Sequence, residues 1–178
     1  MNPYGHLTVI CGPMFAGKTT SLIQIATQAE ATVFKPAFDT RYAVAECVSH
    51  DGECIKAHAI ASLKDIAEVG DTKGPYCIDE AQFFDEDRYD GDFVDDLETL
   101  LSHGIDIYVV GLDLMANGKP FPVMSRLLAM ADSVSKISAN CHICKGRATK
   151  TFRRDGSSLD IDLGADDLYE ARCNQHWK

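Results

Sequence analysis

The sequence contains no run of about 18 apolar residues, the length that a helix needs to cross a membrane. The N-terminus lacks the basic and then apolar pattern of a secretory signal peptide. Seven cysteines, an odd number, occur without such a signal, which is typical of proteins kept in a reducing compartment. We therefore expect a cytoplasmic protein that does not interact with a membrane.

Basic residues are also scarce. Lys and Arg number 17 against 27 Asp and Glu, which gives a formal net charge of −10. Because no basic block occurs, we expect no nucleic-acid partner, and a polyanionic substrate must bind in a local pocket. The longest acidic stretch, Asp85–Asp96, is predicted to be a solvated face or loop. The length of 178 residues allows one globular core and a small appendage.

A strand-loop-helix pattern lies near the N-terminus. A strand over residues 7–11 leads into a G-x-x-x-x-G-K-T loop, and a helical run follows. This P-loop pattern holds phosphate oxygens on backbone N–H groups, with Lys18 at the β- and γ-phosphates and the Thr19 hydroxyl on Mg²⁺. A chance match in a glycine-containing turn is the alternative. The predicted nucleotide-binding residues are Gly12, Pro13, Met14, Phe15, Ala16, Gly17, Lys18, Thr19 and Thr20.

Strands and helices alternate along most of the chain. Strand patterns cover residues 7–11, 32–35, 76–78, 105–110 and 134–137. Helical spacing covers residues 19–30, 62–69, 93–101 and 124–131, and residues 43–59 give no clear pattern. This order predicts an α/β fold with a parallel sheet flanked by helices. The composition changes near Ala139, so we predict a nucleotide-binding domain over residues 1–138 and a small second domain over residues 139–178.

An acidic pair, Asp79 and Glu80, follows the strand pattern over residues 76–78. A carboxylate that ends a strand after a P-loop is typical of the Walker-B arrangement, in which it holds Mg²⁺ directly or through water. The pair can divide its work, with Asp79 on the metal and Glu80 facing the acceptor as a general base. A solvated acidic pair at a strand end is the alternative interpretation.

Two short cysteine motifs occur in the last part of the chain. Together, Cys141-x-x-Cys144 and Cys173-x-x-His176 offer a tetrahedral Cys₃His ligand set with no open position, which favours a structural Zn²⁺ site. The alternative is a set of unrelated thiols and imidazoles. His142 is not needed as a ligand and is predicted to lie at the surface.

The remaining cysteines and a pair of aromatics are assigned from their surroundings. Cys11 and Cys77 lie in predicted strands and are expected in the core. Cys47 and Cys54 are given no role. Phe83–Phe84 is either core, which we favour, or an aromatic platform.

Several motifs then occur in a specific order. They are the segments 12–20, 39–42, 50–51, 78–84, 111–113 and 119–121, together with the two cysteine motifs and Tyr169. With them the chain closely resembles the type II (human cytosolic-like) thymidine kinase family over nearly its whole length. The Gly-Pro-Met-Phe-x-Gly-Lys form of its loop is far more specific than a general P-loop.

The resemblance implies transfer of the γ-phosphate of ATP to the 5′-hydroxyl of thymidine, giving dTMP and ADP in pyrimidine deoxynucleoside salvage for DNA synthesis. It implies a P-loop domain with Mg²⁺ and a small zinc domain whose lasso loop closes over the nucleoside. Family members are usually homotetramers, and many are inhibited by the triphosphate end product. The implied catalytic residues are the base Glu80, Lys18, and Arg41 near the transferring phosphate, with Thr19 and Asp79 on the magnesium side.

The resemblance also implies a substrate-binding set. Met14, Leu112 and Thr151 match residues that line the thymine methyl pocket, and Tyr169 matches the lasso tyrosine. Gly164 suits a lasso position whose backbone contacts the base edge, because a glycine lets the backbone approach a ligand closely. The full set is Met14, Asp39, Arg41, Glu80, Phe83, Leu112, Phe121, Thr151, Gly164 and Tyr169.

The chain departs from the family pattern in places. Ala116 stands where the family generally carries an aromatic beside the base, Leu163-Gly164-Ala165 stands where a Gly-Gly pair is frequent, and the acidic stretch Asp85–Asp96 is unusual. A roomier pocket leaves deoxyuridine or a 5-substituted analogue as alternative acceptors. The alternative function is a P-loop ATPase or zinc-ribbon interaction module without nucleoside kinase activity.

Overall fold

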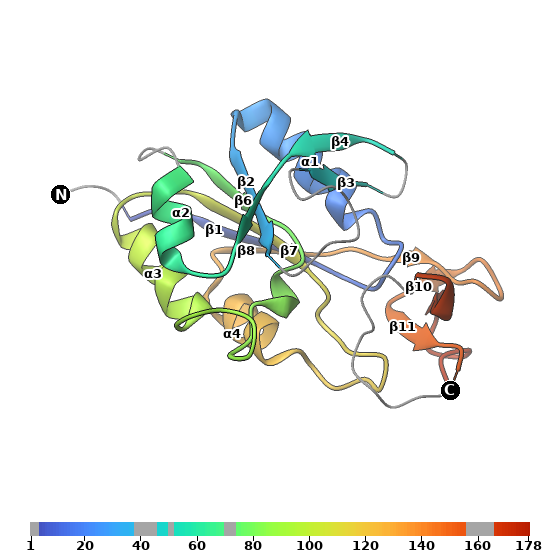
Figure 1. Ribbon diagram of the computed structural model, residues 1–178. Coiled ribbons are helices and arrows are strands. Elements are labelled where there is room, and N and C mark those ends of the chain that lie inside the picture. The colour runs from blue at the N-terminus through green and yellow to red at the C-terminus, as the bar shows by residue number, and fades with distance from the viewer. Residues whose placement is uncertain (1–3, 38–45, 50–51, 70–73, 156–165) are drawn as a thin grey trace.

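A parallel sheet forms the centre of the molecule (Figure 1). The computed structural model describes residues 4–37, 46–49, 52–69, 74–155 and 166–178. Among these residues, six parallel strands pair in the order β5-β2-β6-β7-β1-β8. Their bounds are β1 Leu7–Cys11, β2 Thr32–Pro36, β5 His58–Ile60, β6 Tyr76–Ile78, β7 Ile107–Gly111 and β8 Ser133–Lys136. The α/β fold predicted from the alternation of elements is confirmed.

Helices cover both faces of this sheet. Helix α1 (Lys18–Ala29) packs on one face, and α3 (Phe93–Ser102) and α4 (Pro122–Met130) pack together on the other. Successive residues of a strand point to opposite faces, so Leu7 and Val9 face α3 and α4 whereas Ile10 faces α1. A shorter helix, α2 (Leu63–Val69), packs beside β5. Within the described part of the chain, no helix is both long enough and apolar enough to cross a bilayer.

The segment 43–59, which has no clear pattern in the sequence, contributes short strands. Strands β3 (Glu46–Val48) and β4 (Cys54–Lys56) pair antiparallel beside the sheet, and β5 joins the sheet edge next to β2. Each of these strands has three residues, too few to display a period-2 alternation. The strand predicted over residues 105–110 is observed as β7, Ile107–Gly111, and the carboxylate of Asp106 just before it accepts a hydrogen bond from His6 N at 2.8 Å.

The acidic stretch Asp85–Asp96 is only partly solvated, which corrects the prediction of a solvated face or loop. Its aromatic residues Tyr89 and Phe93 are buried. The rings of Phe84 and Phe93 stack with centroids 4.1 Å apart, and Tyr89 meets both edge-on. The carboxylates stay near the surface while the apolar residues between them turn inward, and the predicted core position of Phe84 is confirmed.

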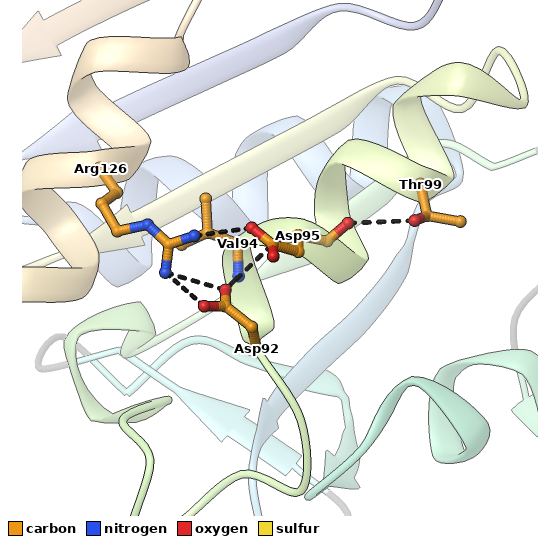
Figure 2. A network of polar contacts seen from close by, with 5 residues as sticks. All are labelled: Asp92, Val94, Asp95, Thr99 and Arg126. Atoms are coloured by element: carbon orange, nitrogen blue, oxygen red, sulfur yellow. Dashed lines mark hydrogen bonds and ion pairs between the residues drawn. The ribbon is translucent and has the colours of Figure 1, made fainter.

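The same stretch also starts α3 (Figure 2). The Asp92 side chain accepts hydrogen bonds from Val94 N at 3.0 Å and Asp95 N at 3.1 Å, which caps the helix. Arg126 of α4 donates to both Asp92 oxygens and to Asp95 Oδ1 at 2.6–2.9 Å, and this hydrogen bonding lowers the pKa of Asp92. The ion pairs therefore tie the start of α3 to α4.

The described residues from Ala139 onward (139–155 and 166–178) are here called the C-terminal lobe. Strands β9 (Ala139–Asn140) and β10 (Arg147–Ala148) pair antiparallel, as do β11 (Lys150–Arg153) and β12 (Tyr169–Arg172). A 3₁₀ turn, η2 (Asp166–Leu168), precedes β12. Small buried residues form its core, and Ala16 of the P-loop packs against them. The lobe therefore lies directly against the P-loop.

Candidate active site

A cavity of about 810 Å³ opens at the carboxyl ends of β1, β6 and β7. Open parallel sheets bind ligands at this edge, and the volume suits a ligand site. The wall of the cavity includes Met14, Phe15, Ala16, Gly17, Lys18, Thr19, Thr20, Asp79, Glu80, Phe83, Leu112 and Tyr169. The structure thus brings together most of the site residues predicted from the sequence.

Two glycines give the P-loop its path. Gly12 has φ +154°, and a Cβ built on it would lie 2.4 Å from the carbonyl oxygen of Ile137, so a larger residue does not fit. Gly17 has φ +80° and precedes the first residue of α1 in the left-handed conformation. Glycine adopts this conformation without a steric cost, and the loop backbone can therefore curl over the start of the helix.

Lys18 lies partly buried inside the loop. Its ammonium donates to the carbonyl oxygen of Pro13 at 2.7 Å. Burial lowers the pKa of Lys18, and the negative charges of Glu80 and Asp79 oppose that shift. A cation is therefore held in the cavity wall, within electrostatic reach of two carboxyl groups.

The P-loop and the end of β6 meet at Asp79, which is buried. Thr19 Oγ1 donates to Asp79 Oδ2 at 3.2 Å, and the Cys47 thiol donates to the same oxygen at 2.8 Å. The other oxygen accepts the backbone N–H of Glu80 at 2.9 Å. Burial, reinforced by the charge of Glu80, raises the pKa of Asp79 to about 6. The sequence gives no sign of the Cys47 contact, because β3 and β6 are brought together only by the fold.

Glu80 has φ +53° and ψ +39°, a left-handed conformation that is uncommon outside glycine. It begins the short 3₁₀ turn η1 (Ala81–Phe83). The amide of Gln82 donates to the Glu80 carboxylate and accepts the backbone N–H of Leu112 at 2.9 Å. Gln82 is only 2% exposed, so its bond with Leu112 N forms away from water, whereas the Glu80 carboxylate lies at the cavity. Sequence reasoning missed this residue, although a polar side chain within a buried turn was a usable signal.

Tyr169 reaches the cavity wall from β12 and is buried. Its partner across the ladder is Arg153, whose guanidinium lies 5.7 Å from the centre of the Tyr169 ring. The same guanidinium donates to both oxygens of Asp155 at 2.8 Å and 3.0 Å. The buried arginine therefore fixes the tyrosine against the cavity.

Among the described residues, two predicted substrate-binding residues lie outside the cavity wall. Phe121 packs in the core beside α4, and Thr151 is buried, with its hydroxyl accepting the N–H of Met14 at 3.1 Å. Three others lie outside the described residues, namely Asp39, Arg41 and Gly164.

The predicted metal ligands gather in the C-terminal lobe. Within the described residues, the ligand atoms of Cys141, Cys144, Cys173 and His176 all lie within 4.8 Å of one another. The Sγ atoms of Cys144 and Cys173 are 3.8 Å apart, and Cys141 Sγ is 3.8 Å from His176 Nδ1. Zn–S bonds of about 2.3 Å in a tetrahedral site place two sulfurs about 3.8 Å apart. The residues therefore fit a zinc ion.

The electrostatics of Cys141 agree with this fit. Burial alone would raise the pKa of its thiol, but backbone N–H groups of Cys144, Cys173 and Ile143 point at the sulfur, and the pKa falls to about 5. The lowered pKa favours the thiolate, the form that binds a metal. His142 is exposed, with Nε2 3.5 Å from Glu170 Oε1, and its predicted surface position is confirmed.

A family model described as thymidine kinase matches residues 5–177. The chain belongs to the thymidine kinase family. Two curated thymidine kinases from two strains of Chloroflexus aurantiacus are each 37% identical over 180 residues, an alignment that spans 95% of this chain and 92% of each relative. The family indicated by the ordered motifs is confirmed. As a member of the thymidine kinase family, the chain is an ATP-dependent nucleoside kinase, a transferase.

Proposed function

We propose that the chain transfers the γ-phosphoryl group of ATP to the 5′-hydroxyl of thymidine. The observation that supports this proposal is the convergence of Lys18, Asp79 and Glu80 on one cavity in a chain of the thymidine kinase family. Phosphoryl transfer needs positioning and charge neutralisation more than covalent chemistry. A carboxylate fixed beside a phosphate-binding loop supplies the positioning.

The P-loop binds the triphosphate. Its backbone N–H groups and the positive end of α1 face the phosphate oxygens, and Lys18 supplies positive charge to the β- and γ-phosphates. Burial sharpens this attraction, because a charge in a site of low dielectric is screened less than one in water. Arg41, near the transferring phosphate, completes the proposed set of cations on the basis of the family resemblance.

Thr19 and Asp79 are the proposed magnesium ligands. The ion, when bound, would supply positive charge that neutralises the phosphate oxygens. Thr19 Oγ1 and Asp79 Oδ2 lie 3.2 Å apart, close to the roughly 2.9 Å between neighbouring ligands of an octahedral Mg²⁺. The thiol of Cys47 and the N–H of Glu80 hold the Asp79 carboxylate in this orientation.

Glu80 is the proposed base. Its carboxylate accepts the proton of the 5′-hydroxyl as that oxygen attacks the γ-phosphorus, and ADP leaves. Gln82 keeps the carboxylate from rotating away during this step.

The nucleoside is proposed to lie against Met14, Phe83, Leu112 and Tyr169, which line the cavity on the side of the C-terminal lobe and η1. Asp39, Phe121, Thr151 and Gly164 stay in the proposed substrate-binding set on the basis of the resemblance. We also propose the division into residues 1–138 and 139–178, a structural zinc ion in the second unit, a cytoplasmic location and a homotetramer.

The test is transfer of labelled γ-phosphate from ATP to a panel of deoxynucleosides. We expect a labelled monophosphate from thymidine. A methyl group in an apolar pocket is worth about 1–3 kcal/mol, so deoxyuridine should be a weaker acceptor. Equal kcat/KM for the two would remove the proposed methyl pocket. ATP hydrolysis without any phosphorylated nucleoside would favour the alternative, a P-loop ATPase or zinc-ribbon interaction module.

Glu80→Gln tests the base in the same assay. The variant keeps the shape of the side chain and loses the proton acceptor, so the turnover rate should fall by about 10²–10⁴-fold. ATP binding should be retained, and turnover near that of the wild type would exclude Glu80 as the base.

A further inference from the structure

One side chain of the C-terminal lobe, Trp177, contacts both the lobe itself and the loop that follows β7. It is the single tryptophan of the chain and directly follows His176 of the cysteine–histidine cluster. Its indole N–H donates to the backbone carbonyl of Thr151 at 3.0 Å. Its six-membered ring lies against Gly118, where a Cβ would come within 2.5 Å of Cη2. The N–H of this residue thus contacts β11, and its ring contacts the loop after β7.

Gly118 lies near the tip of a tight loop that follows β7. Leu114 and Pro120 form an isolated bridge at the base of the loop, and Met115 N donates to Lys119 O at 2.9 Å. The loop follows Leu112 closely in sequence, and Leu112 lines the cavity. A ring pressed against the tip therefore supports the end of β7 that forms the cavity wall.

Thr151 connects the indole to the other side of the cavity. The Thr151 carbonyl accepts the Trp177 N–H, and its hydroxyl accepts the N–H of Met14, a cavity-lining residue. Thr151 also pairs with Ala171 in the ladder that carries Tyr169. Through Thr151, the indole is connected to Met14 of the P-loop and to the β11–β12 ladder that carries Tyr169, and both contribute to the cavity wall.

We propose that Trp177 is a positioning residue that couples the metal cluster to the nucleoside side of the cavity. The cluster fixes the backbone at His176, and the next residue is thereby held between Thr151 and Gly118. When the metal is removed, the cluster side chains are no longer held around one ion. The backbone that carries Trp177 is then no longer fixed, and the indole can leave its contacts. An aromatic ring buries a large area, so its displacement loosens both contacts. The nucleoside in this statement rests on the proposed function.

The fluorescence of Trp177 gives a direct test. Because the chain has no other tryptophan, indole emission reports this position alone. Chelation of zinc from the zinc-loaded protein should move the emission to longer wavelength, as the half-buried ring becomes exposed to water. Added zinc should restore it, and circular dichroism should show that the fold persists. Unchanged emission after measured loss of zinc overturns the proposal.

The kinetics of Trp177→Phe test the link between Trp177 and the nucleoside side of the cavity. The variant keeps an aromatic ring and all four metal ligands, but it loses the N–H donor to Thr151 and the outer edge of the indole that lies against Gly118. We expect the KM for thymidine to rise about fivefold, the size of one lost hydrogen bond, with the KM for ATP and the zinc content unchanged. A merely structural role would lower the melting temperature without separating the two KM values. Trp177→Ala should raise the KM for thymidine further.

Gly118→Ala and Gly52→Ala form a matched pair. Their φ angles are +85° and +84°, so both substitutions bring the same backbone strain, but a Cβ at Gly52 meets no atom within 4 Å. Only Gly118→Ala should raise the KM for thymidine, because only it displaces the indole. In a Trp177→Ala background this effect should largely disappear, as expected for residues in contact.

The two proposals fail separately. If the wild type phosphorylates thymidine but Trp177→Phe and Gly118→Ala keep its KM for thymidine, the coupling is wrong. If the wild type phosphorylates no nucleoside, the proposed function is wrong, and the emission test alone decides whether the cluster controls Trp177.

Discussion

The side-chain amide of Gln82 donates a hydrogen bond to the carboxylate of Glu80. The same amide accepts the backbone N–H of Leu112 at 2.9 Å, so it cannot rotate without leaving a buried polar group unpaired. The proposed base is thus held from the end of β7, a neighbouring strand of the sheet.

Gln82→Glu should test this relationship. The new carboxylate can still accept from Leu112 N but repels Glu80 in place of donating to it. We expect kcat to fall by about 10–100-fold, because misplacement of a reacting group by about 1 Å is that costly. The KM for ATP should stay within about twofold, since the P-loop contacts do not involve Gln82. Gln28→Glu, on the exposed side of α1, is the control for the added charge. An unchanged kcat in the Gln82 variant would contradict a positioning role.

Cys47 should influence the magnesium requirement. Its thiol donates to Asp79 Oδ2 at 2.8 Å, the oxygen that also accepts from Thr19. Cys47→Ala removes that donor, and the magnesium concentration for half-maximal activity should rise about fivefold. Cys47→Ser keeps a donor, so its half-maximal magnesium concentration should lie between those of the wild type and Cys47→Ala. Cys54→Ala changes an exposed thiol on the adjacent strand and should behave as the wild type. A magnesium titration of the four proteins decides the point.

Acid should weaken magnesium binding before it affects the fold. Burial and the charge of Glu80 raise the pKa of Asp79 to about 6, so its carboxylate is ionised above this pH and takes up a proton below it. Magnesium binds the ionised form, and its apparent affinity should drop between pH 7 and pH 5. Because the folded state holds this proton more tightly than the unfolded chain, protonation of Asp79 adds to stability as the pH falls through 6.

The measurement for this prediction is activity against magnesium concentration at several pH values. Excess magnesium should restore much of the rate lost at pH 5.5. A loss of rate at that pH that no amount of magnesium reverses would place the titrating group elsewhere.

The cysteine–histidine cluster should hold about one zinc ion per chain. Elemental analysis of the purified protein checks this value. Cys173→Ser should lose the metal and loosen the C-terminal lobe, as measured by proteolysis. His142→Ala leaves the ligand set intact and should keep the zinc. A metal-free wild type that is fully folded and active would exclude a structural zinc ion.

The local patterns of the sequence were enough to predict the main elements. The strand over residues 7–11 has the predicted bounds, and the helical spacing over residues 62–69 matches α2 (Leu63–Val69) to within one residue. The P-loop, the acidic pair after β6 and the two cysteine motifs were also visible in the sequence. The structure places the first two at one cavity and gathers the ligand atoms of the cysteine motifs within 4.8 Å of one another. Within each motif the residues are close in sequence, so their spacing carries the signal. The two cysteine motifs are themselves far apart, with Cys144 and Cys173 separated by 29 positions, and only the fold brings them together.

Contacts between distant segments were not readable in this way. Cys47 and Asp79 are 32 positions apart, Gln82 and Leu112 are 30 apart, and Trp177 and Thr151 are 26 apart. The tertiary structure alone decided these pairs. The packing of β3 near the end of β6 brings Cys47 to Asp79, and the neighbouring positions of β6 and β7 in the sheet bring Gln82 to Leu112. The folding of the C-terminal lobe on itself brings Trp177 to Thr151. The sequence by itself determined which chemical groups are present and how each local segment folds. The fold decided which carboxylate oxygen, amide and indole face one another, because no local periodicity encodes a contact between segments that are far apart in the chain.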